Sequence, residues 1–208
     1  MQRDTIISII IVIVIVLIVI CILLNIKMCP RITQPTVPFD KIRNRLKTGD
    51  VIAFHGCSLL KATLMRWYLG CASTHVGMVI RKPHRFAGLP DSIFLFDLGP
   101  YTNLNPWRKS DVKMRSLESV LTESPSRTFA LIPAERAIEM SDEDIEIYSS
   151  YKFNYFIPTM FSPYKRYKVC SSFVAKIHED KGIGQKHSYT MSPCDFYNSD
   201  DTIFFTKD

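Results

Sequence analysis

The stretch VCSSFVAKIH, residues 169–178, predicts a helix that begins at a cysteine. Its apolar residues recur at the spacing of one helix face: Phe173, Val174 and Ile177. Ser171 and Ser172 suit a first turn, where side-chain oxygens can meet unpaired backbone N–H groups. A thiol at this position lies near the positive end of the helix dipole, which lowers its pKa and favours the thiolate. Cys170 is therefore either a small buried hydrophobe or an activated nucleophile, and the local pattern allows both.

The segments around this helix predict an α+β domain with an antiparallel sheet. Short β-rich runs bounded by turn signals follow one another, with helical patterns before and after them. We expect strands within residues 51–54, 73–82, 91–100 and 127–133, a last strand in the turn-rich tail, and helices within 58–70, 141–153 and 169–184. This order contains no βαβ repeat, so it favours an α+β fold.

The N-terminal residues predict a membrane anchor. No charge occurs from Thr5 to Ile26, and the run is long enough to cross a hydrocarbon core as a helix. It is longer than the apolar part of a typical signal peptide, and no small-residue cleavage motif follows it. We expect a transmembrane anchor with a short flank at 1–27, a juxtamembrane linker at 28–45 and the soluble domain at 46–208.

Basic residues follow the apolar run: Lys27, Arg31, Lys41, Arg43, Arg45 and Lys47. The positive-inside tendency therefore predicts that the domain lies on the cytoplasmic side, at a host or virion membrane if the chain is viral. The cluster either contacts anionic lipid headgroups or forms an ordinary solvated face, and the sequence allows both.

Charge and cysteine content exclude several classes of protein. The net charge is +6, without a basic stripe, a zinc-finger pattern or a recognition helix, so we expect no nucleic-acid partner. The six cysteines contain no CxxC pair, which argues against a structural zinc site. The domain is large enough to be held by its own core, so we do not expect a disulfide scaffold. Cys29, beside the apolar run, is either a palmitoylation site or an unmodified thiol.

Of the five histidines, His75 best fits the general base that a nucleophilic Cys170 requires. It opens a hydrophobic strand and can face a helix N-terminus packed on the same sheet. Gly77 points to the same face, where the missing side chain would let a helix or substrate approach. Asp97 lies in the next apolar strand, and a buried carboxylate there needs a partner such as an imidazole. The alternative is that Asp97 bonds the turn at 99–100.

Five motifs occur in a characteristic order: TGDVIAFHG (48–56), STHVGMVI (73–80), LFDLGP (95–100), YKFNYF (151–156) and YKVCSSFVAK (167–176). This order resembles the circularly permuted papain-like hydrolases of the NlpC-type superfamily, in the branch with YiiX-like proteins, lecithin:retinol acyltransferase-like enzymes and poxviral relatives. The turn TMSPCDF (190–196) is also similar to the family's C-terminal turn, so the resemblance covers about residues 46–196. Two departures concern the acyltransferase members, which commonly carry a second His in place of Asp97 and Glu-His in place of Ser171-Ser172.

The resemblance implies a permuted papain-like fold in which Cys170 is the nucleophile, His75 the base and Asp97 the third, orienting residue. It also implies thiol acyl transfer on an amide, ester or thioester through an acyl-enzyme, with no metal or organic cofactor. The backbone N–H of Cys170 is the expected first oxyanion donor, and His55 is a candidate for the second.

The substrate class stays open between a peptide, a lipidated protein and a lipid. The anchor favours a substrate near the membrane, although an anchor can also merely localise an enzyme. The aromatic stretch 151–167 either walls an apolar cleft or belongs to the core and a loop. The alternative to an enzyme is a catalytically inert, membrane-anchored structural or interaction protein on the same scaffold.

Overall fold

The computed structural model describes residues 2–25, 32–56, 66, 71–81, 93–98, 109–150, 152–154, 170–183, 192–197 and 201–207. Its strands are β1 (Thr36–Pro38), β2 (Val51–Phe54), β3 (His75–Arg81), β4 (Ile93–Leu98), β5 (Lys109–Ser116), β6 (Thr128–Ile132), β7 (Lys152–Asn154) and β8 (Ile203–Thr206). Its helices are α1 (Gln2–Asn25), α2 (Phe39–Arg43), α4 (Leu117–Glu123), α5 (Asp142–Ser149), α7 (Cys170–Asp180) and the short 3-10 helix η2 (Pro193–Phe196).

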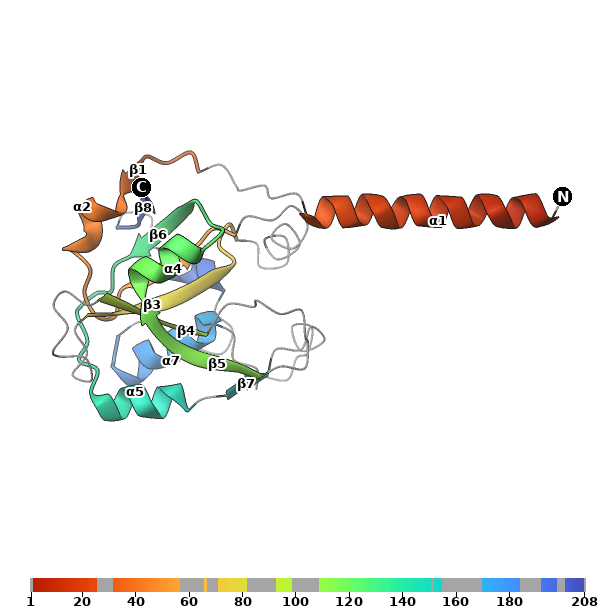
Figure 1. The fold of residues 1–208 in the computed structure, drawn as a ribbon. Coiled ribbons are helices and arrows are strands. Elements are labelled where there is room, and N and C mark those ends of the chain that lie inside the picture. Colours follow the sequence, from red (N-terminus) through yellow and green to blue (C-terminus); the bar gives the residue numbers. More distant parts are fainter. Residues whose placement is uncertain are drawn as a thin grey trace.

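One sheet organises the domain, with the strand order β1-β8-β6-β2-β3-β4-β5-β7 (Figure 1). The predicted α+β class is confirmed. The prediction of an antiparallel sheet holds for every described pair except β1 and β8, which run parallel at one edge. The sequence pattern missed this pair because β1 lies within residues 28–45, the segment expected to be a linker. The same segment supplies α2, whose Phe39 and Ile42 are buried in the core.

Different helices cover the two faces of the sheet (Figure 1). Successive strand residues point to opposite faces. Val76 and Met78 therefore join the core under α5 and α7, whereas Val79 joins the core under α2 and α4. This alternation explains the nearly continuous apolar runs of β2 and β3, because both faces of the central strands are buried.

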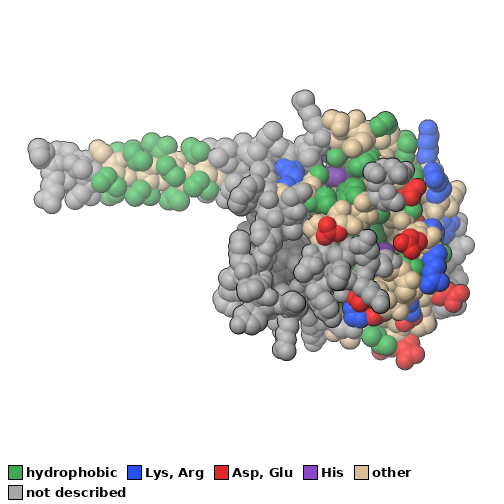
Figure 2. Space-filling model, turned by 180° about the vertical axis from the view of Figure 1, so that it is seen from behind, with side chains coloured by type: hydrophobic (Ala, Val, Ile, Leu, Met, Phe, Trp, Pro, Cys, Tyr) green, Lys and Arg blue, Asp and Glu red, His purple; other side chains and the backbone are tan. Residues whose placement is uncertain are grey.

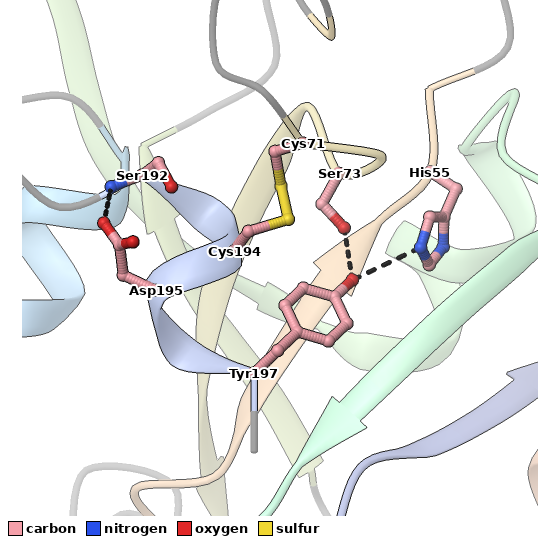
Figure 3. Close-up of a disulfide and its surroundings, with 7 residues drawn as sticks. All are labelled: His55, Cys71, Ser73, Ser192, Cys194, Asp195 and Tyr197. Carbon is pink, nitrogen blue, oxygen red and sulfur yellow. Dashed lines mark hydrogen bonds between the residues drawn. A yellow bond between two sulfur atoms is a disulfide. The ribbon is translucent and has the colours of Figure 1, made fainter. Parts of the chain in front are cut away.

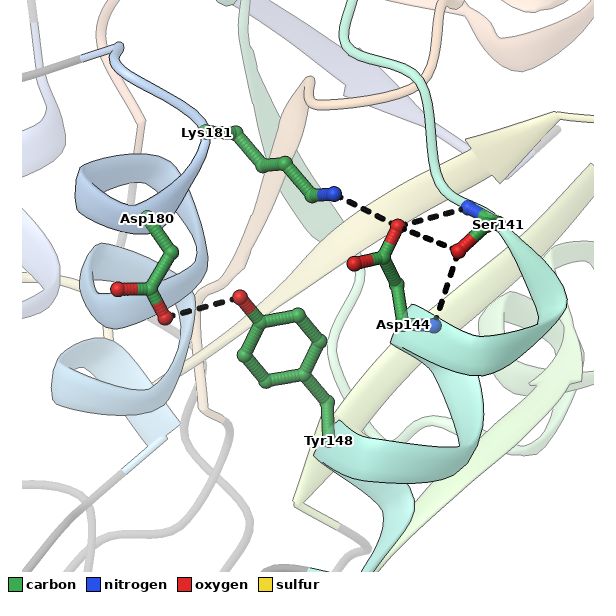
Figure 4. A network of polar contacts seen from close by, with 5 residues as sticks. All are labelled: Ser141, Asp144, Tyr148, Asp180 and Lys181. Atoms are coloured by element: carbon green, nitrogen blue, oxygen red, sulfur yellow. Dashed lines mark hydrogen bonds and ion pairs between the residues drawn. The ribbon is translucent and has the colours of Figure 1, made fainter.

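The start of α5 and the end of α7 are those that the sequence predicted. Ser141 caps α5 through a capping box with Asp144, as the acidic run after Ser141 indicated. Asp144 also pairs with Lys181 at 2.6 Å, and the Tyr148 hydroxyl donates to Asp180 at 2.9 Å (Figure 4). These contacts join α5 to the C-terminal end of α7. Gly182 then adopts a φ of 68°, a conformation that favours glycine, and α7 ends before it as predicted.

The N-terminal residues form a separate helix, α1, outside the layers of the domain (Figure 1). Its described side chains present an almost wholly apolar surface, from Ile7 to Ile20 (Figure 2). Within the part of the chain that the structure describes, no helix is both long and apolar enough to span a bilayer.

Several predictions concern residues that the structure does not describe. The expected helix 58–70 lies outside the described residues apart from Arg66, and so does most of the aromatic stretch 151–167. Cys29 and the turn at 99–100 also lie outside them.

Besides β1 and α2, the structure adds β5, α4 and β7, which the sequence pattern did not predict. β7 covers residues 152–154, whereas the helix expected within 141–153 ends at Ser149. Of these elements β5 matters for the site, because it supplies one of its charged groups.

Candidate active site

The structure brings the three predicted residues together. Cys170 is the first residue of α7, His75 is the first residue of β3, and Asp97 lies near the end of β4. His75 Nε2 lies 2.8 Å from Asp97 Oδ2, and the side chains of His75 and Cys170 share a hydrogen bond. Because the carboxylate accepts the proton on Nε2, Nδ1 is the ring nitrogen left for the thiol.

The three side chains differ in burial. Asp97 has no exposed surface and Cys170 is 5% exposed, whereas 21% of the His75 side chain is exposed. The imidazole is therefore the member of the group that solvent or a substrate reaches most readily.

The electrostatics favour a thiolate–imidazolium pair. Burial by itself lowers the pKa of His75, but the negative charge of Cys170 and hydrogen bonds to Asp97 and Cys170 outweigh it and raise the pKa well above the ordinary value. Burial likewise raises the pKa of the Cys170 thiol, but the charge and hydrogen bond of His75 lower it below its ordinary value. Each group therefore stabilises the charged form of the other.

Two backbone groups add to this effect. Hydrogen bonds from the backbone of Val76 and of Ser171 also lower the pKa of Cys170. Ser171 belongs to the first turn of α7, where N–H groups have no intrahelical acceptor. The helix N-terminus thus contributes to a lowered thiol pKa, as the sequence indicated.

Gly77 serves the site in a different way from the one predicted. A Cβ at Gly77 would lie 2.8 Å from Leu95 Cγ and 2.9 Å from Asp97 Cβ. The gap is therefore filled by side chains of β4, so the expectation that it admits a helix or a substrate is wrong. Cross-strand packing explains the difference, because β3 and β4 are direct neighbours in the sheet.

Asp97 has a second partner that sequence reasoning missed. Arg115 of β5 donates from Nη2 to Asp97 Oδ2 at 3.1 Å and approaches Oδ1 at 3.4 Å. Arg115 lies opposite Leu95 in the register of β4 and β5, one diagonal step from Asp97. The only signal in the sequence is that cationic residues occupy alternate positions, 113 and 115, in KSDVKMRS (residues 109–116).

His55 is not a second oxyanion donor. Its Nδ1 lies 3.1 Å from the carbonyl of Thr128 and its Nε2 lies 3.2 Å from the Tyr197 hydroxyl. Nδ1 must donate to the carbonyl, so in the neutral ring Nε2 is an acceptor and has no proton to offer an oxyanion. The burial of His55 lowers its pKa, which keeps the ring neutral.

A disulfide and a tyrosine hold the turn after α7 beside this histidine (Figure 3). Cys71 and Cys194 form the disulfide, with their Cα atoms 5.6 Å apart. The Tyr197 hydroxyl bonds both His55 and the buried Ser73, which lies two residues before His75. The sequence argued only against a disulfide scaffold and did not predict this pairing, because its cysteines lie 123 positions apart and only the folded chain brings them together.

Of the remaining histidines, the structure describes His178 alone. His178 lies on α7, is 8% exposed and bonds the carbonyl of Gly49 at 2.8 Å, so its role is structural. His84 and His187 lie outside the described residues. Among the described residues, no group of three or more His, Cys, Asp or Glu side chains could hold a metal ion.

Comparisons with known proteins provide no family for this chain. No protein-family model matches it, and no curated protein is significantly similar to it. The geometry of Cys170, His75 and Asp97 is therefore what points to a function.

Proposed function

We propose that this chain is a thiol hydrolase or acyltransferase that cleaves an amide or ester bond through an acyl-enzyme. One observation carries the proposal: Asp97, His75 and Cys170 form a hydrogen-bonded series that ends at a thiol on a helix N-terminus. A base within hydrogen-bond reach of a nucleophile, oriented by a third group, is the arrangement that nucleophilic catalysis needs.

The chemistry follows from the two protonation states of the pair. The Cys170 thiolate attacks the substrate carbonyl, and the C=O electron pair moves onto oxygen. The backbone N–H of Cys170 is the nearest candidate to stabilise that oxyanion. His75 then gives its Nδ1 proton to the leaving amine or alcohol as the C–N or C–O bond breaks. In the second half, neutral His75 takes a proton from water or another acceptor nucleophile, which attacks the thioester and releases Cys170.

The fold supports a further assignment within this proposal. The His-bearing strand β3 precedes the Cys-bearing helix α7, and α7 packs on β3 and β4. This is the order expected for a circularly permuted papain-like hydrolase, and we propose that architecture for residues 46–208.

Membrane attachment is part of the proposal and rests on the uncharged run from Thr5 to Ile26. Two features point in opposite directions on its orientation. The basic residues after the run favour a cytoplasmic domain, whereas the disulfide between Cys71 and Cys194 is typical of an oxidising compartment. A peptide, a lipidated protein or a lipid near the bilayer is the substrate class that this placement favours.

One observation favours an inert scaffold as the second candidate. Cys170 is 5% exposed, so a substrate carbonyl would have to reach a largely buried sulfur. Under this reading the side-chain series is a structural network, and the chain binds a partner at the membrane instead of turning over a substrate.

Alkylation of Cys170 in the full chain separates the two candidates. The protein is kept in mild detergent and treated with iodoacetamide between pH 5.5 and 8, and the rate at Cys170 is read by peptide mass spectrometry. An activated thiolate predicts fast labelling well below pH 8, slowed about 10²–10⁴-fold in His75→Gln. The matched control, His55→Gln, removes a neighbouring buried imidazole and should label Cys170 at a rate close to that of the wild type.

The proposal would be abandoned if Cys170 labels slowly at all these pH values and His75→Gln leaves the rate unchanged. If the thiol is activated, turnover of model amides and esters by the wild type, absent in Cys170→Ala, tests the acyl-transfer step itself.

A further inference from the structure

Arg115 is a further charged partner of Asp97, in addition to the hydrogen-bonded series of Cys170, His75 and Asp97. Its guanidinium forms an ion pair with Asp97 Oδ2 at 3.1 Å, the same oxygen that His75 contacts, and 24% of the Arg115 side chain is exposed. Asp97 itself has no exposed surface. A buried carboxylate is costly unless it is paired, so the charges of its neighbours decide how well Asp97 can orient and stabilise the His75 imidazolium.

In the proposed reaction, the charge opposite Asp97 changes during each turnover. His75 is an imidazolium beside the thiolate, and becomes neutral once it protonates the leaving group. In the second state Asp97 would be a buried anion without a cation if His75 were its only partner. Arg115 remains positive through both states, because a guanidinium does not lose its proton in proteins.

The other charged groups near Asp97 cannot compensate its negative charge in this way. The charged or titratable residues on the elements around it are His75 and Arg81 from β3, Lys109, Asp111, Lys113 and Arg115 from β5, Glu118 and Glu123 from α4, and Cys170, Lys176, His178, Glu179 and Asp180 from α7. Arg81 bonds the backbone carbonyls of residues 43, 44 and 46, and Lys176 pairs with Asp180. Lys113 lies opposite Asp97 in register, but its side chain is exposed. Glu118 is exposed and pairs with Arg43 at 2.9 Å. Cys170 acts through His75.

We infer that Arg115 is a positioning residue that compensates the charge of Asp97 and thereby sets the pH range in which the Cys170–His75 pair is active. This inference rests on the proposed function and deepens it. Arg115 touches neither the thiol nor the ring in any described contact, so its effect passes through Asp97. The Nε of Arg115 has no hydrogen-bond partner, which leaves Nη2 as the group that holds the carboxylate.

The sign of the effect follows from charge. Loss of the guanidinium makes the surroundings of His75 and Cys170 more negative, which favours the protonated form of both groups. Both limbs of a pH–rate profile should therefore move to higher pH in Arg115→Gln. In Arg115→Lys the charge is kept, and both limbs should stay close to those of the wild type, because a single nitrogen, Nη2, makes both contacts of Arg115 with Asp97.

The test uses the full chain in mild detergent and iodoacetate as the probe. The acid limb of Cys170 alkylation reports thiolate formation, and the alkaline limb reports loss of the imidazolium that attracts this anionic reagent. We expect both limbs to rise by about half a pH unit or more in Arg115→Gln, with Arg115→Lys restoring them. In an Asp97→Asn background, the Arg115→Gln shift should disappear, because the effect passes through the carboxylate.

The outcomes are distinguishable. If wild-type Cys170 shows no activated labelling, the proposed function fails and the inference fails with it. If the wild type is activated but the limbs of Arg115→Gln coincide with it, or shift equally in the Asp97→Asn background, only the inference fails. If Arg115→Gln does not fold, Asp97→Asn/Arg115→Gln decides: a folded double variant supports charge compensation of Asp97, and an unfolded one makes Arg115 a structural residue and overturns the inference.

Discussion

His75 and His55 lie almost side by side in the sheet, yet their surroundings shift their pKa values in opposite directions. His75 pairs in register with Phe54, the residue directly before His55. The pKa of His75 is raised, because the negative charge of Cys170 and the hydrogen bonds to Asp97 and Cys170 outweigh burial. The pKa of His55 is lowered, because burial outweighs its hydrogen bond to the Thr128 carbonyl and the charge of Arg66 lowers it further.

This difference shows that the partners of a histidine, more than its burial, decide its use. Anionic partners favour the protonated form of His75 beside the Cys170 thiol. Neutral partners make His55 a fixed link between β6 and Tyr197.

The largest effect is expected from Asp97→Asn, which removes an anion beside His75. Without it the imidazolium is less stable, so the pKa of Cys170 should move back toward its ordinary value of 9.0. We expect the alkylation rate of Cys170 near pH 6.5 to fall about 10²-fold or more, measured by peptide mass spectrometry. An unchanged rate would mean that Asp97 only supports the sheet.

Removal of the disulfide alters the surroundings of His55. The double variant Cys71→Ser/Cys194→Ser frees the turn that holds Tyr197 on His55. For a closed loop of 123 residues, chain entropy predicts a loss of about 4–5 kcal/mol in the free energy of unfolding. Urea unfolding of the full chain measures it, and reduction of the wild type should reproduce it. Equal stability of the oxidised, reduced and double-Ser forms would contradict this role.

A smaller effect is expected from Gly77→Ala, which leaves every polar partner in place and shifts only their positions. The added Cβ would lie under 3.0 Å from Leu95 and Asp97, so β4 must move. Overpacking of this kind costs about 1–3 kcal/mol. Thermal unfolding measures the cost, and the alkylation rate of Cys170 should fall with it. Ordinary stability and an ordinary rate together would show that β4 yields freely there.

The smallest effect is on the pH dependence of stability. A histidine with a lowered pKa stabilises the fold fully above its unfolded value of 6.5, and this contribution is lost as the pH falls through the folded pKa. His55 and His178 both belong to this class, so stability should decline below pH 6.5. In His55→Gln the decline should be shallower, and the rest should come from His178 and from the Cys170–His75 pair. Urea unfolding between pH 5 and 7.5 measures the slopes, and parallel slopes would contradict the argument.

The Cys170–His75 pair also adds to that decline, because below pH 6.5 the unfolded chain gains a proton on the His75 imidazole, whereas the folded pair remains an imidazolium and a thiolate. At higher pH, up to 9.0, it contributes no slope. Between pH 6.5 and 9.0, the folded pair holds a protonated imidazole and a thiolate, and the unfolded chain holds a neutral imidazole and a thiol. The number of bound protons is equal, so the pair gives no slope in this window.

Much of the fold could be predicted because its signals are local. The strands of residues 51–54 and 128–132, the cap at Ser141 and the stop at Gly182 depend on periodicity and on single turn residues. β5 was missed because KSDVKMRS alternates without a strong apolar face, and only its place between β4 and β7 makes it a strand.

The sequence by itself determined that a cysteine begins an amphipathic helix, that a histidine opens a hydrophobic strand and that an aspartate lies in the next one. The tertiary structure decided which groups meet: Arg115 with Asp97 across a strand pair, Cys71 with Cys194 across the chain, and Tyr197 with His55. The physical reason is the distance along the chain over which each feature is determined. Helix starts and strand periods follow from neighbours a few residues apart, whereas the partner of a buried charge follows from strand register, which the whole core sets.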